Sequence, residues 1–464
     1  MSHKHTKSRR KQNFYPPKGI LNQARPTRQA RVNHHQTHRP RSKPPFAFDH
    51  VDVKAAANVY AKAQEVDSRN GFVREIRFHG ENSRLMKCQT SITADPLVYE
   101  YLAGMFVNTY LVPRFPNFIQ TYGCYRFSDH NFYQFLQNMR DPQRVLPATF
   151  RKCLTTVNVN AANITTEICS QNAKYNCLLL EYVQISTTFE ALLKHKEEAG
   201  REVAGLLYQI YFALSRVKDV FTHYDLHMDN VLLQKCPDGG YYDFHYFDDA
   251  NREKVRFKSQ YMAKFIDYGM SYYLDGARGV GGVGGSRGVC ESLCREPRCN
   301  ANVGRYENTE CGGEFGVKYC RDDKRKPRYN DYHISRLRKN ESHDLKLAHQ
   351  LLPYMQGNVT LQRLGVEVLG RIDYGKGYGS EGDVEYKKWR TEYRNKDIDD
   401  PREFGTEESV LGDGGGRGGR IKNVVDLERA LADFLRVNDK YDGRGSKAKG
   451  SYYIYANGRY KLRN

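Results

Sequence analysis

The sequence predicts an α+β fold, because strand-like and helix-like apolar patterns follow one another along the chain. Between residues 49 and 183, short apolar and aromatic runs are bounded by Gly, Asn and Ser, which is typical of strands. Farther on, residues 202–221 form a long apolar segment that is predicted to be a helix. The chain has 464 residues, of which 39% are hydrophobic, so it can bury a sizeable core arranged in two or three domains or lobes.

The N-terminal segment, residues 1–46, differs in composition from the rest. It is rich in Lys, Arg, His, Gln and Pro and has almost no acidic or bulky apolar residues, so it cannot bury enough surface to offset its ordering entropy. We predict a disordered basic tail. The formal net charge of the chain is +19, which favours anionic partners. The tail could bind nucleic acid or an acidic surface, act as a nuclear address, or be a solvated arm without a dedicated role.

Several strands and one helix are predicted before residue 184. The helix covers residues 95–111, where Asp95 is the expected cap, Pro96 lies in the first turn, and apolar residues recur every three or four positions. The predicted strands are FVREIRF (72–78), RLMKC (84–88), FIQTYGCYRF (118–127) and NCLLLEYV (176–183).

The rest of the chain mixes helices with short strands. Strands are expected at VLL (231–233) and AKFIDYG (263–269), and GGYYDFHYFDD (239–249) is predicted to be an inserted hairpin. Two glycine-rich tracts, 276–288 and 412–420, are predicted to be mobile linkers, because ordering glycine costs the most backbone entropy. Further predicted elements are the helices SHDLKLAHQLL (342–352) and VVDLERALADFL (424–435) and the final hairpin GSYYIYANGRYKL (450–462).

The chain begins without the apolar core of a signal peptide, and no apolar run approaches the roughly 20 residues needed to cross a bilayer. We therefore expect a soluble, intracellular protein without membrane insertion, in which most of the 11 cysteines are reduced thiols or metal ligands. Two interpretations fit the cysteines after residue 289: free or loosely buried thiols, or a structural zinc site. The candidate ligands are Cys290, Cys294, Cys299 and Cys311, with Cys320 close behind.

The stretch FTHYDLHMDNVLL, residues 221–233, concentrates ionisable and amide groups ahead of a predicted strand. One interpretation is zinc, since His223 and His227 are four residues apart and would share a helix face. A zinc metalloprotease helix needs a glutamate directly after its first histidine, and Tyr224 stands there instead. An ordinary polar turn is a second interpretation, but it leaves the spacing of the acidic and amide groups unexplained.

Phosphoryl transfer is the third interpretation, and it uses these groups. Asp225 and Asn230 lie ahead of one predicted strand, and Asp267 ends the next one. Such a reaction needs a carboxylate that orients the attacking hydroxyl, and an amide oxygen and a second carboxylate that hold Mg²⁺ against the nucleotide phosphates. Hard oxygen ligands suit magnesium.

These motifs resemble those of the protein-kinase superfamily. HYDLHMDN is similar to the catalytic loop HRDLxxxxN, and IDYG is similar to the DFG motif. The order and wording of the motifs are closest to the divergent serine/threonine kinases of large DNA viruses. The resemblance covers roughly residues 65–350 and continues more weakly to about 435. It implies that Asp225 is the catalytic base, Asn230 a Mg²⁺ ligand and Asp267 the principal Mg²⁺ ligand.

The same resemblance implies an ion pair near the nucleotide phosphates. Lys87 in the strand RLMKC and Glu100 in the helix that follows fit this pair. Ahead of them, SRNGFVREI resembles a degenerate Gly-rich loop, in which Gly71 and Val73 would cover the nucleotide. A single glycine remains there, so fewer backbone N–H groups can approach the phosphates.

Four more residues receive roles by resemblance. NCLLLEYV is similar to the kinase hinge, where backbone groups of Glu181 and Val183 would contact adenine. Asp344 in SHDLKLAHQLL resembles the buried aspartate that braces the catalytic loop. His223 would pack and hydrogen-bond the backbone of that loop.

Three features depart from the family pattern. Tyr224 stands where many kinases have an arginine that clamps a phosphorylated activation loop, so regulation by that route is not expected. His227 replaces a lysine common in protein serine/threonine kinases and matches a histidine of small-molecule kinases such as aminoglycoside phosphotransferases. The interval between Asn230 and Asp267 is also long, which is why an inserted hairpin is predicted there.

The resemblance implies a two-lobed kinase-like fold and an ATP- and Mg²⁺-dependent serine/threonine protein kinase. The expected alternatives are a pseudokinase or virion scaffold that binds nucleic acid or capsid protein, and a small-molecule kinase. If the protein is viral, it would act in the host-cell cytoplasm or the virion. The predicted organisation is a basic tail (1–46), an N-lobe (47–183), a C-lobe with a Gly/Cys-rich activation segment (184–435) and a C-terminal hairpin extension (436–464).

Overall fold

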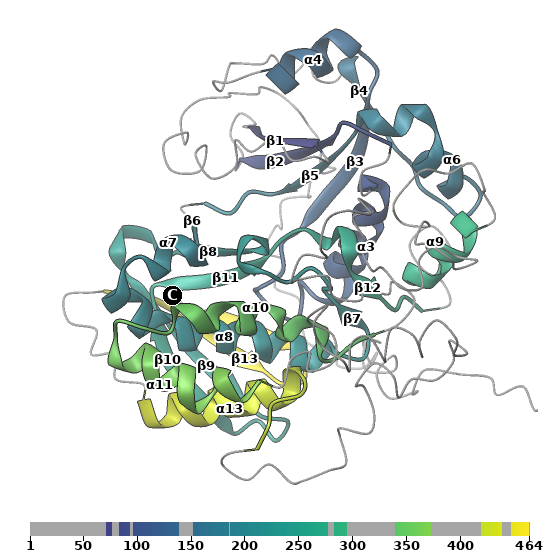
Figure 1. The fold of residues 1–464 in the computed structure, drawn as a ribbon. Helices are drawn as coiled ribbons and strands as arrows, with labels where there is room; N and C mark the ends of the chain where they lie inside the picture. Colours follow the sequence, from purple (N-terminus) through teal and green to yellow (C-terminus); the bar gives the residue numbers. More distant parts are fainter. Residues whose placement is uncertain are drawn as a thin grey trace, which may run out of the picture. The chain divides into compact units, whose positions relative to one another are not determined.

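A computed structural model gives a mixed α+β fold (Figure 1). The predicted tail, Asp95, most of the second glycine tract, Cys299, Cys311 and Cys320 lie outside the residues that it describes. Every described residue belongs to one compact unit, Phe48–Asn464. The described residues are 71–76, 83–92, 96–138, 152–184, 186–276, 283–294, 339–372, 419–438 and 447–463.

The first sheet has five strands in the order β1-β2-β5-β3-β4, and all its neighbours are antiparallel. Lys87 lies opposite Val73 on one side and Leu178 on the other. The four strands predicted in this region are confirmed, and the short β4 is an addition. The bounds are β1 Gly71–Ile76, β2 Arg84–Gln89, β3 Thr121–Phe127, β4 Leu154–Thr156 and β5 Asn176–Glu181.

Helix α3 (Leu97–Tyr110) packs against this sheet, as Figure 1 shows beside β3. The predicted helix is confirmed, although Pro96 is its N-cap and not part of its first turn. Gly104 allows the close approach, because a Cβ there would lie 2.1 Å from Thr121 Oγ1. Two helices of this region were not predicted, α4 (His130–Asn138) and α6 (Ile164–Cys169).

Helix α8 (Lys196–Val217) is the central helix of the second part of the chain. It begins six residues before the predicted start and ends before Phe221, which belongs to the short strand β7 (Phe221–Thr222). Nearly all of its second half is buried, which explains why the sequence is apolar on every side there. The helices that complete this part are α7 Phe189–Leu193, α10 Lys346–Leu351, α11 Val359–Glu367 and α13 Val424–Asn438.

Two small sheets lie next to the residues with predicted catalytic roles, because β7 leads into the loop that carries Asp225 and β11 (Tyr261–Phe265) ends just before Asp267. In the three-stranded one, β8 (Val231–Lys235) pairs with β6 (Ser186–Thr188) and β11. In the other, β7 pairs with β12 (Tyr272–Tyr273). The strands predicted at VLL and AKFIDYG are thus confirmed, and they are neighbours.

A further sheet joins segments that lie far apart in the sequence. The inserted hairpin consists of β9 (Tyr241–Phe247) and β10 (Glu253–Ser259), and the C-terminal hairpin consists of β13 (Ala448–Tyr455) and β14 (Arg459–Arg463). The C-terminal hairpin was predicted, whereas the range 239–249 predicted for the inserted hairpin contains only β9, and β10 follows it. The union of the two hairpins was not predicted: β13 runs parallel to β9 in a four-stranded sheet. We call this the hairpin sheet.

The prediction of a mobile linker over residues 276–288 is wrong for its last residues. Helix α9 spans Gly285–Cys294, and Ser286 Oγ donates to Tyr273 O at 3.0 Å while accepting from Tyr273 N at 3.2 Å. Gly288 is required by packing, since a Cβ there would lie 1.9 Å from Val283 O. Tertiary contacts therefore order a segment whose composition favours a loop.

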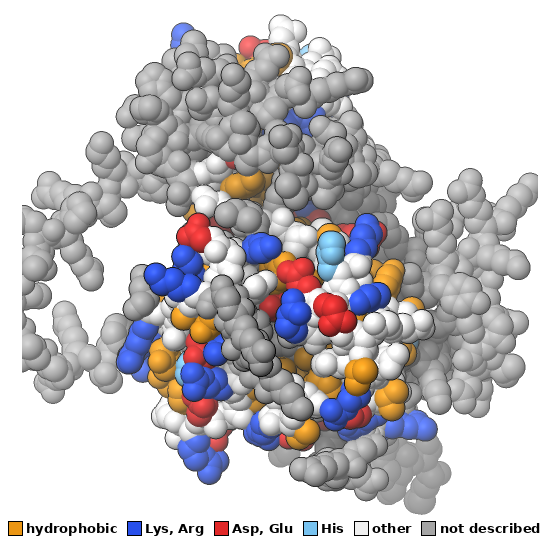
Figure 2. Space-filling view, turned by 90° about the vertical axis from the view of Figure 1, so that its left-hand side faces the viewer, with side chains coloured by type: hydrophobic (Ala, Val, Ile, Leu, Met, Phe, Trp, Pro, Cys, Tyr) orange, Lys and Arg blue, Asp and Glu red, His pale blue; other side chains and the backbone are white. Residues whose placement is uncertain are grey.

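Five described cysteines are buried free thiols and Cys169 is disulfide-bonded, which is compatible with the prediction that most cysteines are reduced. The five are Cys88, Cys124, Cys153, Cys177 and Cys236. Among the described helices, none combines the length and apolarity needed to span a bilayer. On the face that Figure 2 draws, charged side chains of both signs lie among scattered hydrophobic ones.

Candidate active site

The loop that follows β7 is held by a carboxylate from a distant segment. The backbone N–H groups of His223 and Tyr224 donate to the two carboxylate oxygens of Asp344 at 2.8 and 2.9 Å. Tyr224 has a left-handed φ of 62°, which is costly for a bulky residue and persists only where the surroundings fix it. The Tyr224 ring is buried and packs edge-on against His343, so no charged side chain occupies this position. Burial raises the pKa of Asp344 to about 7.

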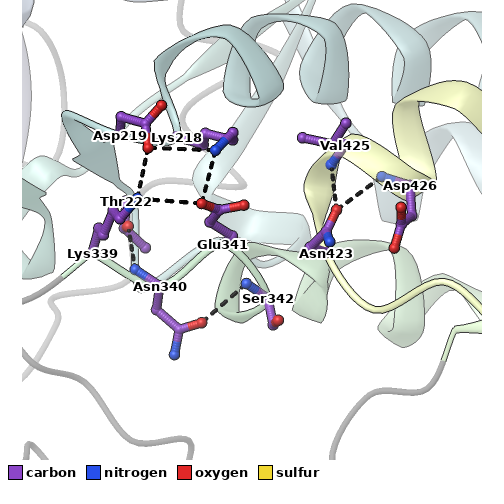
Figure 3. A network of polar contacts seen from close by, with 10 residues as sticks. All are labelled: Lys218, Asp219, Thr222, Lys339, Asn340, Glu341, Ser342, Asn423, Val425 and Asp426. Carbon is purple, nitrogen blue, oxygen red and sulfur yellow. Dashed lines mark hydrogen bonds and ion pairs between the residues drawn. The ribbon is translucent and has the colours of Figure 1, made fainter. Parts of the chain in front are cut away.

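A polar network anchors the segment that carries Asp344 (Figure 3). Asn340 N donates to Thr222 Oγ1 at 2.9 Å, directly before the loop, and Val424 N donates to Glu341 O at 2.9 Å, at the start of α13. Two ion pairs lie beside these hydrogen bonds. Lys218 Nζ is 2.9 Å from Glu341 Oε1, and Lys339 Nζ is 2.6 Å from Asp219 Oδ1. The network ties residues 339–342 to the end of α8 and to α13, so Asp344 is positioned by two helices.

His223 connects the loop to the segment after β11. Its Nε2 lies 3.0 Å from Ile266 O, and its Nδ1 is buried without a hydrogen-bond partner. This assigns the neutral tautomer in which Nε2–H donates to Ile266 O. Burial lowers the pKa of His223, although the charges of Asp225 and Asp267 oppose that effect. His223 is therefore a buried structural group that lies within electrostatic reach of both aspartates.

The zinc interpretation of His223 and His227 loses its structural basis. The helix that would place both rings on one face does not form, since residues 223–227 are irregular and the next helical turn covers only Met228–Asn230. His227 Nδ1 accepts from Asp229 N at 3.3 Å, whereas His223 Nε2 faces a carbonyl. Within the described residues, no three His, Cys, Asp or Glu side chains converge as a metal site.

Asp225 is surrounded by groups that stabilise its charge. Lys346 Nζ lies 3.6 Å from its Oδ1, His227 Nε2 lies 3.8 Å from its Oδ2, and Asn230 Nδ2 lies 3.2 Å from the same Oδ2. Burial alone would raise the pKa of Asp225, but the nearby His227 ring and the charge of Lys346 hold it well below the usual range. The carboxylate remains one-third exposed, so an ionised oxygen is accessible from solvent at neutral pH.

Lys87, Glu100 and Asp267 form a second charged group. Lys87 Nζ lies 2.7 Å from Glu100 Oε2 and 3.0 Å from Asp267 Oδ1, which joins β2, α3 and the segment after β11. Burial alone would lower the pKa of Lys87, but the charges of Asp267 and Glu100 outweigh it and raise the pKa. Glu100 is buried, whereas the Asp267 side chain is 39% exposed. The predicted Lys87–Glu100 pair therefore forms, with Asp267 as a second partner.

The two groups are linked through the backbone. Ile266 N donates to Asn230 O at 3.1 Å, so the residue before Asp267 is tied to the end of the loop that carries Asp225. Asp267 itself has a left-handed φ of 64° and accepts from Gly269 N at 3.3 Å. Among the described non-glycine residues, four have positive φ, and two of these, Tyr224 and Asp267, lie in this site. Backbone strain thus concentrates at the candidate active site.

Oxygen donors for magnesium are present at this point. Asn230 uses its Nδ2 to hold Asp225, at 2.8 Å from the backbone O, which leaves its Oδ1 without a hydrogen bond among the described residues. Asp267 offers a partly exposed carboxylate. A carboxylate and an amide oxygen are ligands of the type that Mg²⁺ accepts, because it keeps several waters and takes substrate phosphates as further ligands.

The positions of the predicted nucleotide-binding residues suit the predicted role to different degrees. Gly71 begins β1, where a Cβ would lie 1.8 Å from Cys88 O, so a close strand contact also requires glycine there. Glu181 N donates to Gln120 O at 2.8 Å and is not available to a ligand. Val183 N donates no hydrogen bond within the described residues, although Val183 O accepts from Ser186 Oγ at 3.3 Å. Of these two backbone N–H groups, that of Val183 is the one without a described acceptor and could donate to a ligand.

Lys346 is the residue of the site that the sequence reasoning missed. It follows Asp344 by two positions and is buried, yet it lies at the start of the short helix KLAHQL. The signal was a lysine in an otherwise apolar helical turn, which is unusual unless the cation has a partner. Only the folded chain brings it to Asp225, 121 residues away.

No protein-family model matches the chain, and no curated protein has a matching sequence.

The Lys87–Glu100 pair gives a testable prediction. Lys87→Met and Glu100→Gln should each reduce nucleotide-dependent phosphoryl transfer, and the double variant should lose less than the product of the two effects, because both changes disrupt one interaction. The measurement is a double-mutant cycle on kcat/KM for Mg-ATP. Lys254→Met is the matched control, since Lys254 forms another largely buried pair, with Glu428 at 2.9 Å. It should lower stability and spare the KM for Mg-ATP. Strictly multiplicative losses at Lys87 and Glu100 would contradict the prediction.

Proposed function

We propose that this protein is an ATP- and Mg²⁺-dependent protein kinase of two-lobed, kinase-like architecture that phosphorylates serine or threonine. One observation carries the proposal: an ionised, braced aspartate (Asp225) lies in a loop that is tied by a backbone hydrogen bond to a Lys–Glu–Asp ion cluster. An ion cluster alone is often structural, and a polar loop alone is often a turn. Their combination supplies the groups that phosphoryl transfer requires.

In this proposal, Asp225 accepts a hydrogen bond from the acceptor hydroxyl and orients its oxygen toward the γ-phosphorus. The lowered pKa of Asp225 keeps its carboxylate ionised and makes it a weak base. Its main role is therefore to position the hydroxyl, and removal of the proton early in the reaction is secondary. Lys87, held by Glu100, contacts the nucleotide phosphates. Asp267 and Asn230 would hold magnesium, which neutralises phosphate charge when bound.

Lys346 and His227 extend this proposal to the acceptor side. Both lie within 4 Å of Asp225, at 3.6 and 3.8 Å. Charge on the transferring phosphoryl group spreads over its peripheral oxygens, and a fixed cation near the base is favourably placed to attract them. We therefore assign to Lys346 the second positive charge of the site, beside Lys87.

Substitution of Lys346 tests that assignment. Lys346→Met should lower kcat by about tenfold or more and Lys346→Arg by much less, because the charge and not the side-chain packing is needed. The acidic limb of the kcat profile should also move to higher pH: Lys346 lowers the pKa of Asp225, so its loss lets Asp225 protonate at a higher pH. A purely structural lysine would reduce stability and leave the pH profile in place.

A transfer assay tests the proposed function itself. The full chain is incubated with Mg-[γ-³²P]ATP and, separately, with a basic protein, an acidic protein and an aminoglycoside, and Asp225→Asn serves as the inactive control. Label on a protein hydroxyl that depends on Asp225 supports the proposal. Label only on the aminoglycoside would favour a small-molecule kinase, for which His227 beside Asp225 is the motivating observation. Nucleotide binding without any transfer would indicate a pseudokinase.

A further inference from the structure

The hairpin sheet has one face against the helices and one face away from them. Helices α8 and α13 pack on the sheet, in front of β9, β10 and β13 in Figure 1. Side chains alternate along each strand, and those facing α8 include Tyr246 and Phe257, whose rings pack around Tyr208 at 4.9 and 6.1 Å. The residues that alternate with these along each strand therefore form the opposite, outer face.

Aromatic rings from β9 and β13 stack on this outer face. His245 and Tyr453 are paired in register, with ring centroids 4.7 Å apart and planes inclined by 8°. Phe247 and Tyr455 form the next pair, at 4.6 Å and 17°, and Phe247 also lies 6.3 Å from Tyr453. Phe247, Tyr453 and Tyr455 are only half-buried. The outer face thus carries near-parallel rings, three of which are half-buried.

Cations flank the rings along the edge strand β14. Register places Arg459 opposite Tyr455, Lys461 opposite Tyr453 and Arg463 opposite Ser451, so all three side chains project on the ring side of the sheet. All three are exposed, and Arg463 lies over the Tyr453 ring at 4.9 Å. Arg459 and Lys461 form no ion pair with any described carboxylate.

The carboxylates of this face are already engaged. Asp243 pairs with Arg256 from β10, and Glu253 Oε2 lies 2.7 Å from His245 Nδ1. The positive charges of β14 are therefore not neutralised by the acidic groups on the same face. A surface with this charge favours a polyanion, and one with parallel rings favours flat, stackable groups.

We propose that the outer face of the hairpin sheet binds single-stranded nucleic acid. Bases would stack on the half-buried ring of Tyr455 and on the Arg463 guanidinium that covers Tyr453, while phosphates contact Arg459 and Lys461, the combination that sequence-tolerant single-strand binding requires. A duplex hides its base faces, and an acidic protein offers few flat rings, so single strands fit this surface best. This inference is independent of phosphoryl transfer, because none of these residues belongs to the Asp225 and Lys87 groups.

The test uses the full chain and fluorescent oligouridine and oligothymidine, whose comparison separates RNA from single-stranded DNA. Tyr453→Leu should weaken binding by about fivefold or more, and Tyr453→Phe should bind like the wild type, because stacking needs the ring and not the hydroxyl. The double variant Arg459→Ala/Lys461→Ala should reduce the magnitude of the slope of log K against log salt by about 1.4, since two single-strand phosphate contacts are lost. Thermal unfolding midpoints show whether each variant is folded.

The matched control is Lys194→Ala/Arg363→Ala, which removes the same number of charges from the C-cap of α7 and from α11. It should leave the affinity and the salt slope near wild-type values. Photo-cross-linking with 4-thiouridine should label peptides of β9 and β13. The proposal is overturned if the sheet variants bind like this control, if cross-links fall only within residues 1–46, or if Tyr453→Leu weakens heparin binding as much as oligonucleotide binding. A dimer that Tyr453→Leu dissociates, with oligonucleotide binding unchanged, would identify the face as a self-interface and also overturn it.

Discussion

Asp225→Asn is expected to lower the rate of phosphoryl transfer by about 10²–10⁴-fold while the affinity for Mg-ATP stays within a few-fold. The amide keeps the size of the side chain but loses the charge that Lys346 and His227 stabilise, so the acceptor hydroxyl is no longer oriented. In this proposal, nucleotide binding depends instead on Lys87, Asp267 and Asn230, and Asn230 keeps its hydrogen bond to the Asp225 backbone oxygen. Single-turnover transfer and equilibrium nucleotide binding, measured on the same preparation, separate the two quantities.

Asp229→Asn is the control for this experiment. It makes the same chemical change four residues farther along the same loop, at a side chain that is 78% exposed. Its turnover should remain near that of the wild type. His223→Ala should behave differently from both, since loss of the bond to Ile266 O lowers stability as well as rate. An Asp225→Asn variant as active as Asp229→Asn would remove Asp225 from the mechanism.

Asp267→Asn is expected to abolish transfer and to make nucleotide binding insensitive to magnesium, because a neutral amide is a poor substitute for a carboxylate as a Mg²⁺ ligand. The fold should remain intact, since asparagine tolerates the left-handed φ of 64° that this position requires. Titration of nucleotide binding with Mg²⁺, with and without the substitution, measures the effect.

Asp238→Asn provides a closely matched control. Asp238 also has a left-handed φ, of 52°, and its carboxylate forms an ion pair with Lys449 at 2.9 Å, but it lies in the turn between β8 and β9. Substitution there removes an exposed pair, which contributes little to stability, and should leave transfer and Mg²⁺ dependence unchanged. If the two variants respond alike to Mg²⁺, Asp267 is not the metal ligand that we propose.

Much of the candidate site was predictable because its parts are local in sequence. Asp225 and Asn230 share one short loop, and their spacing alone brings both to the start of β8. Lys87 and Glu100 lie on a strand and on the helix that follows it; both elements were predicted from their patterns, and the resemblance to kinases implied the pair. In each case a short separation along the chain limits the arrangements that the backbone can adopt.

Other predictions failed where long-range contacts decide the outcome. The glycine tract was expected to be a linker, but contacts between Ser286 and Tyr273 order the start of α9. The amphipathic helix α11 was missed, although Asn358 caps it through a side-chain bond to Thr360 N at 2.8 Å. A weak local signal is overridden when the rest of the fold supplies partners, and composition does not report those partners.

The residue patterns predicted an α+β protein with strands at the expected positions, and the resemblance to kinases added the roles of the loop ahead of β8 and the lysine–glutamate pair between β2 and α3. The packing of distant elements was needed to show that Lys346 approaches Asp225 and that β13 joins β9 to create a basic aromatic face. The physical reason is that periodicity and turn chemistry specify which residues are buried and where elements end. Contacts between residues more than a hundred positions apart depend on how complete elements pack, and no local pattern encodes that choice.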